Sequence, residues 1–133
     1  MENLEHQASN LFGEKEYSKA LEIYTLLFQG NRKNENYAIS CGNCYDALGE
    51  KSKAIEFYNE ALKINKNSAA ALLNLSTIYY ELKDYEQSTD YAYKVLKINQ
   101  NNSAAWQNLA NIAFCQSNYD EALKYYKKIY EYN

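Results

Sequence analysis

Three cysteines and one histidine are the side chains best suited to metal or redox chemistry in this sequence. Cys41 and Cys44 form a C-x-x-C motif, and only Cys115 and His6 could complete the four ligands of a zinc site. A redox C-x-x-C is expected at the start of a helix beside a βαβ unit, and no such unit is visible. The motif therefore favours buried structural cysteines, and we predict neither a metal site nor a cofactor.

The sequence also lacks the common catalytic motifs. No G-x-G-x-x-G, G-K-S/T, G-x-S-x-G or H-E-x-x-H pattern occurs. A histidine-based triad would depend on His6, which is the single imidazole of the chain. These observations predict that the chain is not an enzyme and has no catalytic residues.

The composition limits the classes of partner. The 133 residues include 17 Asp and Glu against 14 Lys and Arg, so the net charge of −3 gives no general attraction for a nucleic-acid backbone. No apolar run is long enough to span a membrane, and the residues after Met1 are polar, unlike those of a signal peptide. We therefore expect a cytoplasmic chain that binds neither nucleic acid nor membranes.

The elements that carry these residues recur with a strict period of 34 residues. Small residues return at two positions of each period, and a tyrosine returns at a third position in three of the four periods. The recurring sets are Ala8, Gly42, Ser76 and Ala110; Ala20, Ala54, Ser88 and Ala122; and Tyr24, Tyr58, Ala92 and Tyr126. We divide the chain into four units without insertions, residues 1–34, 35–68, 69–102 and 103–133, which form a single domain over residues 1–133.

Each unit is predicted to contain two helices. In the third unit, apolar residues from Leu72 to Leu82 recur at spacings of three and four, which is typical of an amphipathic helix. A polar interruption follows, and a second helix is predicted from Tyr85 to Ile98. Asn and Ser residues between the units favour helix caps and turns, and no strand pattern appears. The predicted fold class is all-α, and each helix pair buries its apolar face by stacking on the next pair.

The fourth unit contains the pattern Trp106-x-x-Leu109-Ala110, and Ala122 is followed four residues later by Tyr126. The second unit matches at corresponding positions, namely Gly42, Tyr45, Ala54 and Tyr58. This pattern resembles the tetratricopeptide repeat, a helix–turn–helix unit of the same length. The proline that usually closes such a repeat is replaced by Arg32, Lys66 and Gln100, which weakens the rigidity of the turns.

The resemblance implies an α-solenoid of four helix–turn–helix units that form a right-handed superhelix. Relatives are scaffolds or adaptors, and they bind peptides or segments of other proteins in a concave groove lined by the first helices. The peptide-binding residues that the resemblance implies here are Asn43, Asn74, Thr77, Tyr80, Asn108 and Asn111. Amides at these positions could pair with a peptide backbone, or they could make packing bonds between helices, and the sequence leaves both interpretations open.

Charge narrows the expected ligand of this groove. No Lys or Arg occupies the groove positions that the resemblance implies. A carboxylate entering the groove would meet Asp46 and Glu81 and would find no counter-charge. The expected partner is therefore a neutral or basic protein segment rather than an acidic C-terminal tail.

The two ends of the chain differ in the helix stripe that a neighbouring repeat would cover. The stripe of the first unit is polar throughout and consists of Asn3, Gln7, Asn10 and Glu14, as expected of an end that faces water. The last unit instead presents Leu123, Tyr126 and Tyr130. This apolar face suggests an alternative function, in which the chain is a structural module that forms a homodimer or is capped by a partner. The tyrosine hydroxyls could also make the face tolerant of water, and the chain could be a fragment.

Overall fold

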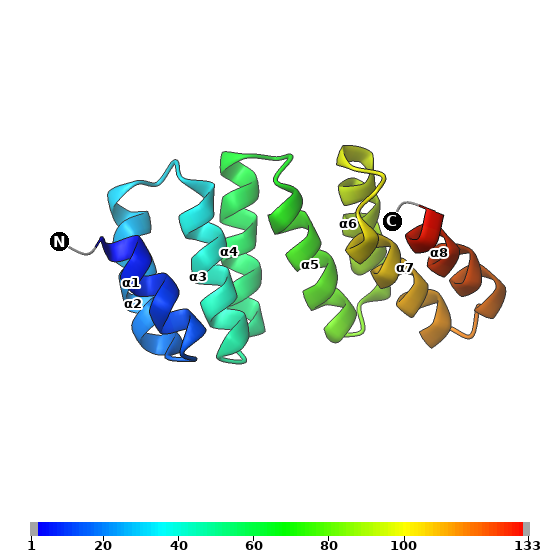
Figure 1. Cartoon of the computed structure of the whole chain (residues 1–133), viewed down its shortest axis with the longest axis horizontal. Helices are drawn as coiled ribbons and strands as arrows, with labels where there is room; N and C mark the ends of the chain where they lie inside the picture. Colours follow the sequence, from blue (N-terminus) through cyan, green and yellow to red (C-terminus); the bar gives the residue numbers. More distant parts are fainter. Residues whose placement is uncertain (1–2, 132–133) are drawn as a thin grey trace. The chain divides into compact units, whose positions relative to one another are not determined.

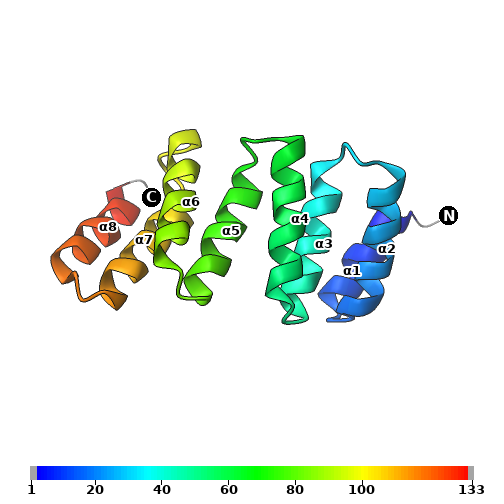
Figure 2. The same cartoon turned by 180° about the vertical axis from the view of Figure 1, so that it is seen from behind.

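The computed structural model describes residues 3–131, and this part of the chain consists of eight α-helices without a strand (Figure 1). Short turns join successive helices, as the view from behind also shows (Figure 2). The helices are α1 (Leu4–Gly13), α2 (Tyr17–Gly30), α3 (Glu35–Ala47), α4 (Lys51–Ile64), α5 (Ala69–Glu81), α6 (Tyr85–Ile98), α7 (Ser103–Cys115) and α8 (Tyr119–Glu131). The prediction of an all-α helical-repeat fold is confirmed.

The helix boundaries follow the sequence period. Helices α2, α4, α6 and α8 each begin 34 residues after the one before, and α3, α5 and α7 keep the same spacing. Helix α6 has the predicted bounds Tyr85–Ile98. Eight helices in the described residues therefore fit the helix pairs expected of the four units.

The chain also divides into two compact units, Met1–Ala71 and Leu72–Asn133. From here on, the first unit and the second unit are these two parts, and the 34-residue units are called repeats. In the first unit, α2 packs against α1 and α3, and α3 also packs against α4. In the second unit, α7 packs against α6 and α8. A single domain over residues 1–133 therefore stays a prediction.

Asparagine and serine side chains organise the connections between helix pairs. A side-chain oxygen accepts a hydrogen bond from a backbone N–H in the first turn of α1, α3, α5 and α7, at 2.7, 2.9, 3.3 and 3.0 Å. The residues that supply these caps are Asn3, Asn34, Ser68 and Asn102. Three further amides, 34 residues apart, each accept from the N–H two residues ahead and are Asn31, Asn65 and Asn99. These local bonds define the turns in the absence of proline.

The turn inside each helix pair contains one residue in the left-handed region. These residues also lie 34 positions apart and are Lys15 (φ 65°), Gly49 (φ 82°), Lys83 (φ 65°) and Ser117 (φ 64°). Only the second repeat has glycine there, which reaches a positive φ without the steric cost that a Cβ atom imposes. The other three turns adopt the same backbone despite that cost.

Small residues allow the two helices of a pair to approach closely. A Cβ atom added to Gly42 in α3 would lie 2.6 Å from Cε1 of Tyr58 in α4, and the Tyr58 side chain is 1% exposed. In the second unit, the α5–α6 contact instead has two buried serines. The Oγ of Ser76 donates to the carbonyl oxygen of Ser88 at 2.9 Å, and the Oγ of Ser88 donates to the carbonyl oxygen of Ser76 at 2.6 Å. Gly42, one of the recurring small residues, therefore lies where α3 closely approaches the Tyr58 ring of α4.

Candidate peptide-binding surface

The first helices of the pairs have a distinctive charge pattern. Helices α1, α3, α5 and α7 contain no Lys or Arg, and every Lys and Arg of the chain lies in the second helices or in the connections. The carboxylates of these first helices are Glu5, Glu35, Asp46 and Glu81. Asp46 accepts from the Nζ of Lys51 in α4 at 2.9 Å. A ligand that contacts the first helices meets neutral or acidic side chains.

Asn108 in α7 forms a bridge to α5 in the second unit. Its Nδ2 donates to the Oγ of Ser76 and to the Oγ1 of Thr77, both at 3.2 Å. No hydrogen bond from another residue in the described range reaches its Oδ1, so this oxygen can accept from a ligand. Asn108 therefore combines a packing role with an available acceptor, and Thr77 lies exposed beside it.

Asn111 lies one turn further along α7, and the group that it leaves available is a donor rather than an acceptor. Its Oδ1 accepts from the hydroxyl of Tyr126 in α8 at 2.6 Å. Its Nδ2 donates to none of the residues between 3 and 131. In the first unit, Tyr58 donates to the Oδ1 of Asn43 in the same way, also at 2.6 Å. The tyrosine bond thus orients the amide and, in Asn111, leaves the amide nitrogen as a donor.

The remaining predicted binding residues are Asn74 and Tyr80 in α5. Asn74 is half-buried and has interactions within the protein. The hydroxyl of Tyr80 lies 3.6 Å from the Sγ of Cys115 in α7, and this hydrogen bond, followed by burial, raises the pKa of Tyr80 to about 12. Five of the six predicted residues therefore belong to the second unit, and Asn43 belongs to the first.

An aromatic pair at the end of three of the four first helices, α1, α5 and α7, was missed by the sequence reasoning. A ring at position 12 of a repeat contacts a ring five residues later, at centroid distances of 5.1, 6.0 and 5.3 Å. The pairs are Phe12–Tyr17, Tyr80–Tyr85 and Phe114–Tyr119. The second repeat has Asp46 and Lys51 at these positions and forms an ion pair instead. The period-34 alignment of the two positions could have revealed the pairing, since both members change together.

The C-x-x-C motif lies inside the first unit rather than on a surface. Cys41 and Cys44 in α3 are 0% exposed. Burial raises the pKa of Cys41 to about 11 and that of Cys44 to about 12. Cys115 is exposed on α7. Among residues 3–131, no three His, Cys, Asp or Glu side chains gather where they could hold a metal ion.

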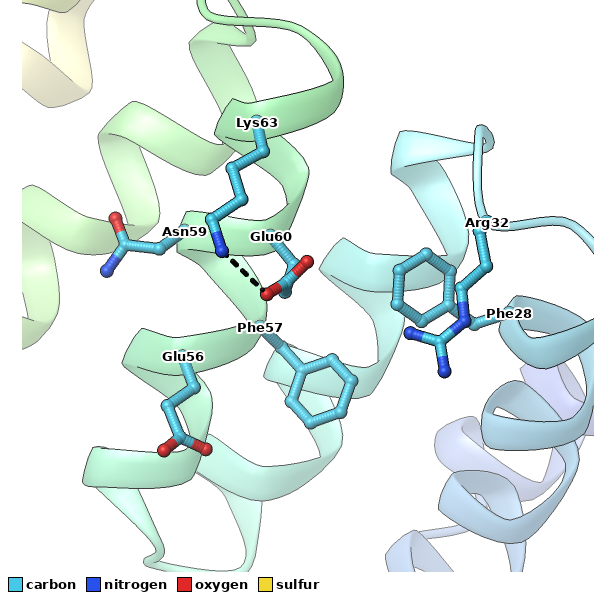
Figure 3. A pocket seen from close by; sticks show the side chains of 7 residues that line it. All are labelled: Phe28, Arg32, Glu56, Phe57, Asn59, Glu60 and Lys63. Atoms are coloured by element: carbon cyan, nitrogen blue, oxygen red, sulfur yellow. Dashed lines mark hydrogen bonds and ion pairs between the residues drawn. The ribbon is translucent and has the colours of Figure 1, made fainter.

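A cavity of about 410 Å³ lies between the second helices α2 and α4 of the first unit (Figure 3). Its aromatic walls are Phe28 and Phe57, whose rings meet edge-on at 6.2 Å. The guanidinium of Arg32 lies 4.9 Å from the centroid of the Phe28 ring, and the Nζ of Lys63 pairs with Glu60 at 3.1 Å. The sequence analysis predicted no ligand site between α2 and α4.

Part of the predicted C-terminal association face makes contacts within the protein. Leu123 is 54% exposed and Tyr130 is 82% exposed on α8. Tyr126 is half-buried, and its hydroxyl donates a hydrogen bond to the Oδ1 of Asn111 in α7. At the other end, Asn3, Asn10 and Glu14 of the predicted polar stripe are exposed, whereas Gln7 is half-buried.

Family comparisons agree with this architecture. Three models described as tetratricopeptide repeat match residues 39–68, 68–101 and 103–133. The chain belongs to the tetratricopeptide-repeat family, whose members are generally non-catalytic scaffolds for protein interactions. Over residues 3–131, no helix has the length and apolar character needed to cross a membrane.

Solved structures share the fold at low sequence identity. MamA protein superposes with a TM-score of 0.86 at 20% identity, over 97% of this chain and 70% of that one. A tetratricopeptide repeat protein from Parabacteroides merdae gives 0.85 at 25% identity over 95% of this chain, which spans 49% of that protein's length. The first such domain of Spaghetti (RPAP3), bound to the HSP90 peptide SRMEEVD, gives 0.81 at 20% identity, over 86% of this chain and 90% of that one. No curated protein matches the sequence significantly.

Proposed function

We propose that the chain is a non-catalytic scaffold that binds an extended peptide or protein segment along the first helices. The observation that carries the proposal is a pair of amide side chains on α7, each of which has one polar group bonded within the protein and the other available. Asn108 keeps a free acceptor oxygen and Asn111 keeps a free donor nitrogen. Residues three apart on a helix lie on one face, so both groups can reach the same ligand.

An extended backbone presents the groups that such a surface can bind. Each residue of the ligand offers one N–H and one C=O, which match the Asn108 acceptor and the Asn111 donor without reading the side chains. Thr77 adds a hydroxyl beside Asn108. Asn74 and Tyr80 on α5, and Asn43 in the first unit, are proposed to extend the same mode of binding.

The charge of the first helices supports a neutral or basic ligand. The RPAP3 domain is bound to a peptide that contains two Glu and an Asp. Here the first helices lack Lys and Arg and carry four carboxylates, so such a peptide would find no counter-charge on them. A cationic segment would gain attraction instead of repulsion.

The substitution Asn111→Asp tests the binding role apart from the packing role. Aspartate keeps an oxygen that accepts from Tyr126, but it replaces the donor nitrogen by a second acceptor. Peptides selected from a random display library on the native protein are expected to bind Asn111→Asp roughly tenfold more weakly. One hydrogen bond is lost, and the new carboxylate oxygen faces the carbonyl oxygen of the ligand. Titration calorimetry with the selected peptides measures the change.

Asn101→Asp is the matched control, because it adds the same charge in an exposed loop outside α5 and α7. It should leave the affinity of neutral peptides unchanged, and urea unfolding should show both variants to be folded. If the library yields no binder, or if Asn111→Asp binds the selected peptides as tightly as the native protein, the proposed surface is wrong.

The exposure of Leu123 and Tyr130 favours a second candidate function, self-association through the α8 face. Two large apolar side chains exposed together on one helix are typical of an interface. We expect light scattering behind size exclusion to give a dimer mass at high concentration. The double variant Leu123→Glu with Tyr130→Glu should then run as a monomer near 15.5 kDa, because burial of two carboxylates opposes association.

Ile98→Glu provides the control for this experiment. Ile98 is 44% exposed at the end of α6, so its substitution adds a charge outside the α8 face. The dimer should persist in that variant. A native protein that stays monomeric over a roughly tenfold range of concentration would contradict self-association, as would a dimer that persists in the double variant.

A further inference from the structure

A second cavity lies in the second unit, away from the α5–α7 surface. Its volume is about 460 Å³, within the range of ligand pockets in proteins. Helix α6 and the following turn supply four of its six lining residues, and α7 and α8 supply one each. The lining residues are Tyr93, Leu96, Lys97, Gln100, Trp106 and Lys128.

The apolar walls of this cavity are held in place by hydrogen bonds. The indole Nε1 of Trp106 donates to the carbonyl oxygen of Gln100 at 2.8 Å, so its polar group is satisfied inside the protein. The hydroxyls of Tyr93 and Tyr125 lie 2.8 Å apart, and Tyr125 donates to Glu121 at 3.0 Å. Leu96 is 7% exposed. The cavity therefore offers preformed aromatic and aliphatic contacts to a ligand side chain.

The charged residues of the lining are both lysines. Lys97 forms no ion pair with any carboxylate of residues 3–131. Lys128 pairs with Glu131 at 3.4 Å, but both side chains are substantially exposed, and exposed pairs of this kind contribute little. The cavity consequently has two ammonium groups at an apolar surface, with no acidic residue in its lining.

The corresponding cavity of the first unit provides an internal comparison (Figure 3). Two repeat lengths separate Phe28 from Leu96 at the apolar wall, and the same interval separates Glu60 from Lys128 at the rim. The first-unit cavity thus has a carboxylate where the second-unit cavity has an ammonium group. Together with Glu56, Glu60 balances the two cations of the first-unit lining. The positive character is specific to the second unit.

We propose that the cavity between α6 and α8 binds an acidic peptide segment through one apolar side chain. That side chain packs against Leu96 and Trp106, and the carboxylates on either side of it pair with Lys97 and Lys128. Charge complementarity selects this ligand, because a lysine-rich segment would meet two like charges at the rim. The site lies outside the surface proposed above and carries the opposite charge preference.

The test uses Trp106, which is the single tryptophan of the chain and lines the cavity. An acetylated and amidated Glu-Glu-Leu-Glu-Glu peptide, titrated into the full chain, should change the Trp106 fluorescence in a saturable manner, with the same affinity by calorimetry. Glu-Glu-Ala-Glu-Glu and Lys-Lys-Leu-Lys-Lys should bind at least roughly tenfold more weakly. Raising the salt from about 20 to about 300 mM should weaken binding several-fold, because the charges are exposed.

Variants of the two lysines provide the decisive comparison. Lys97→Glu with Lys128→Glu should weaken binding of Glu-Glu-Leu-Glu-Glu roughly tenfold or more, and the neutral pair Lys97→Gln with Lys128→Gln should have a smaller effect. Lys124→Glu is the matched control, since Lys124 is exposed on α8 and does not line the cavity. Asn111→Asp should leave this binding unchanged, which separates the site from the α5–α7 surface.

Three results would each overturn the proposal. The first is the absence of saturable binding of Glu-Glu-Leu-Glu-Glu at millimolar concentration. The second is equal binding of the Leu and Ala peptides. The third is equal loss of affinity in Lys124→Glu and in the Lys97 and Lys128 variants, because this would mean a diffuse attraction to the lysines of α8 rather than a site. Circular dichroism melting of each variant verifies that the comparison is made between folded proteins.

Discussion

The substitution Gly42→Ala is expected to lower the free energy of unfolding by about 1–3 kcal/mol, the usual cost of overpacking a core. An added methyl group would lie 2.6 Å from Cε1 and 2.8 Å from Cδ1 of Tyr58, well inside van der Waals contact. The ring cannot easily move aside, because it is 1% exposed and its hydroxyl is bonded to Asn43 at 2.6 Å. The strain must therefore fall on the α3–α4 contact itself.

The sign of this effect should reverse when the ring is removed. Tyr58→Ala alone is expected to cost about 3–5 kcal/mol, as for other large buried aromatic residues. In that background, Gly42→Ala should stabilise by about 0.5–1 kcal/mol, because the clash is gone and alanine is the better helix former. In the third repeat, the position of Gly42 is Ser76, which has a Cβ atom, and the position of Tyr58 is the small residue Ala92.

Urea unfolding followed by circular dichroism gives the four free energies of this double-mutant cycle. Gly13→Ala is the matched control, because an added Cβ there meets nothing within 4 Å. It should be neutral or slightly stabilising. If Gly42→Ala were equally unfavourable with and without the Tyr58 ring, the close approach of the two residues would not be the cause.

The second large effect is a loss of stability at alkaline pH that originates in Cys41 and Cys44. Burial raises the pKa of these thiols to about 11 and about 12, above the value of 9.0 for an exposed thiol. The native state therefore keeps its two protons when the unfolded chain releases them. This stabilisation is complete below about pH 9 and is lost as the pH rises towards the native pKa values. From about pH 8 to pH 10, the free energy of unfolding should fall by about 2–3 kcal/mol from these two thiols.

Urea titrations at a series of pH values measure this slope in the native protein and in Cys41→Ala with Cys44→Ala. The double variant should lose most of the thiol contribution, while Cys115→Ala, which changes an exposed thiol, should keep it. Half-buried tyrosines such as Tyr91 contribute a decline of the same sign, because partial burial also raises their pKa. The comparison between variants isolates the cysteines from them. Equal slopes in all three proteins would contradict buried thiols as the origin.

Reactivity provides an independent view of the same burial. A thiol reagent at neutral pH should modify Cys115 rapidly and leave Cys41 and Cys44 protected until the protein unfolds, since the thiolate is the reactive form. Mass spectrometry of the labelled protein identifies the modified residues. Rapid labelling of all three cysteines in the folded protein would be incompatible with the buried positions in α3.

The sequence alone determined the helices, their pairing and the family. Helix formation and capping depend on contacts within a few residues, so the spacing from Leu72 to Leu82 and the amides near Asn99 carried enough information to place the elements. The strict period also marks Gly42 as one of the positions that hold a small residue in every repeat, and the structure places a close helix contact there. These features are local or repeated, and a single sequence records them directly.

The tertiary structure decided which atoms of the predicted site remain available. Asn108 and Asn111 looked equivalent as amides, but one offers an oxygen and the other a nitrogen to a ligand, because the hydroxyl of Thr77 accepts from Asn108 whereas the hydroxyl of Tyr126 donates to Asn111. Those partners lie on other helices, and the sequence does not specify their orientation. The lysine-rimmed cavity beside Trp106 was likewise absent from the sequence reasoning, since its walls come from three helices whose packing brings them together. Side-chain availability depends on long-range packing, whereas helix placement depends mainly on local sequence.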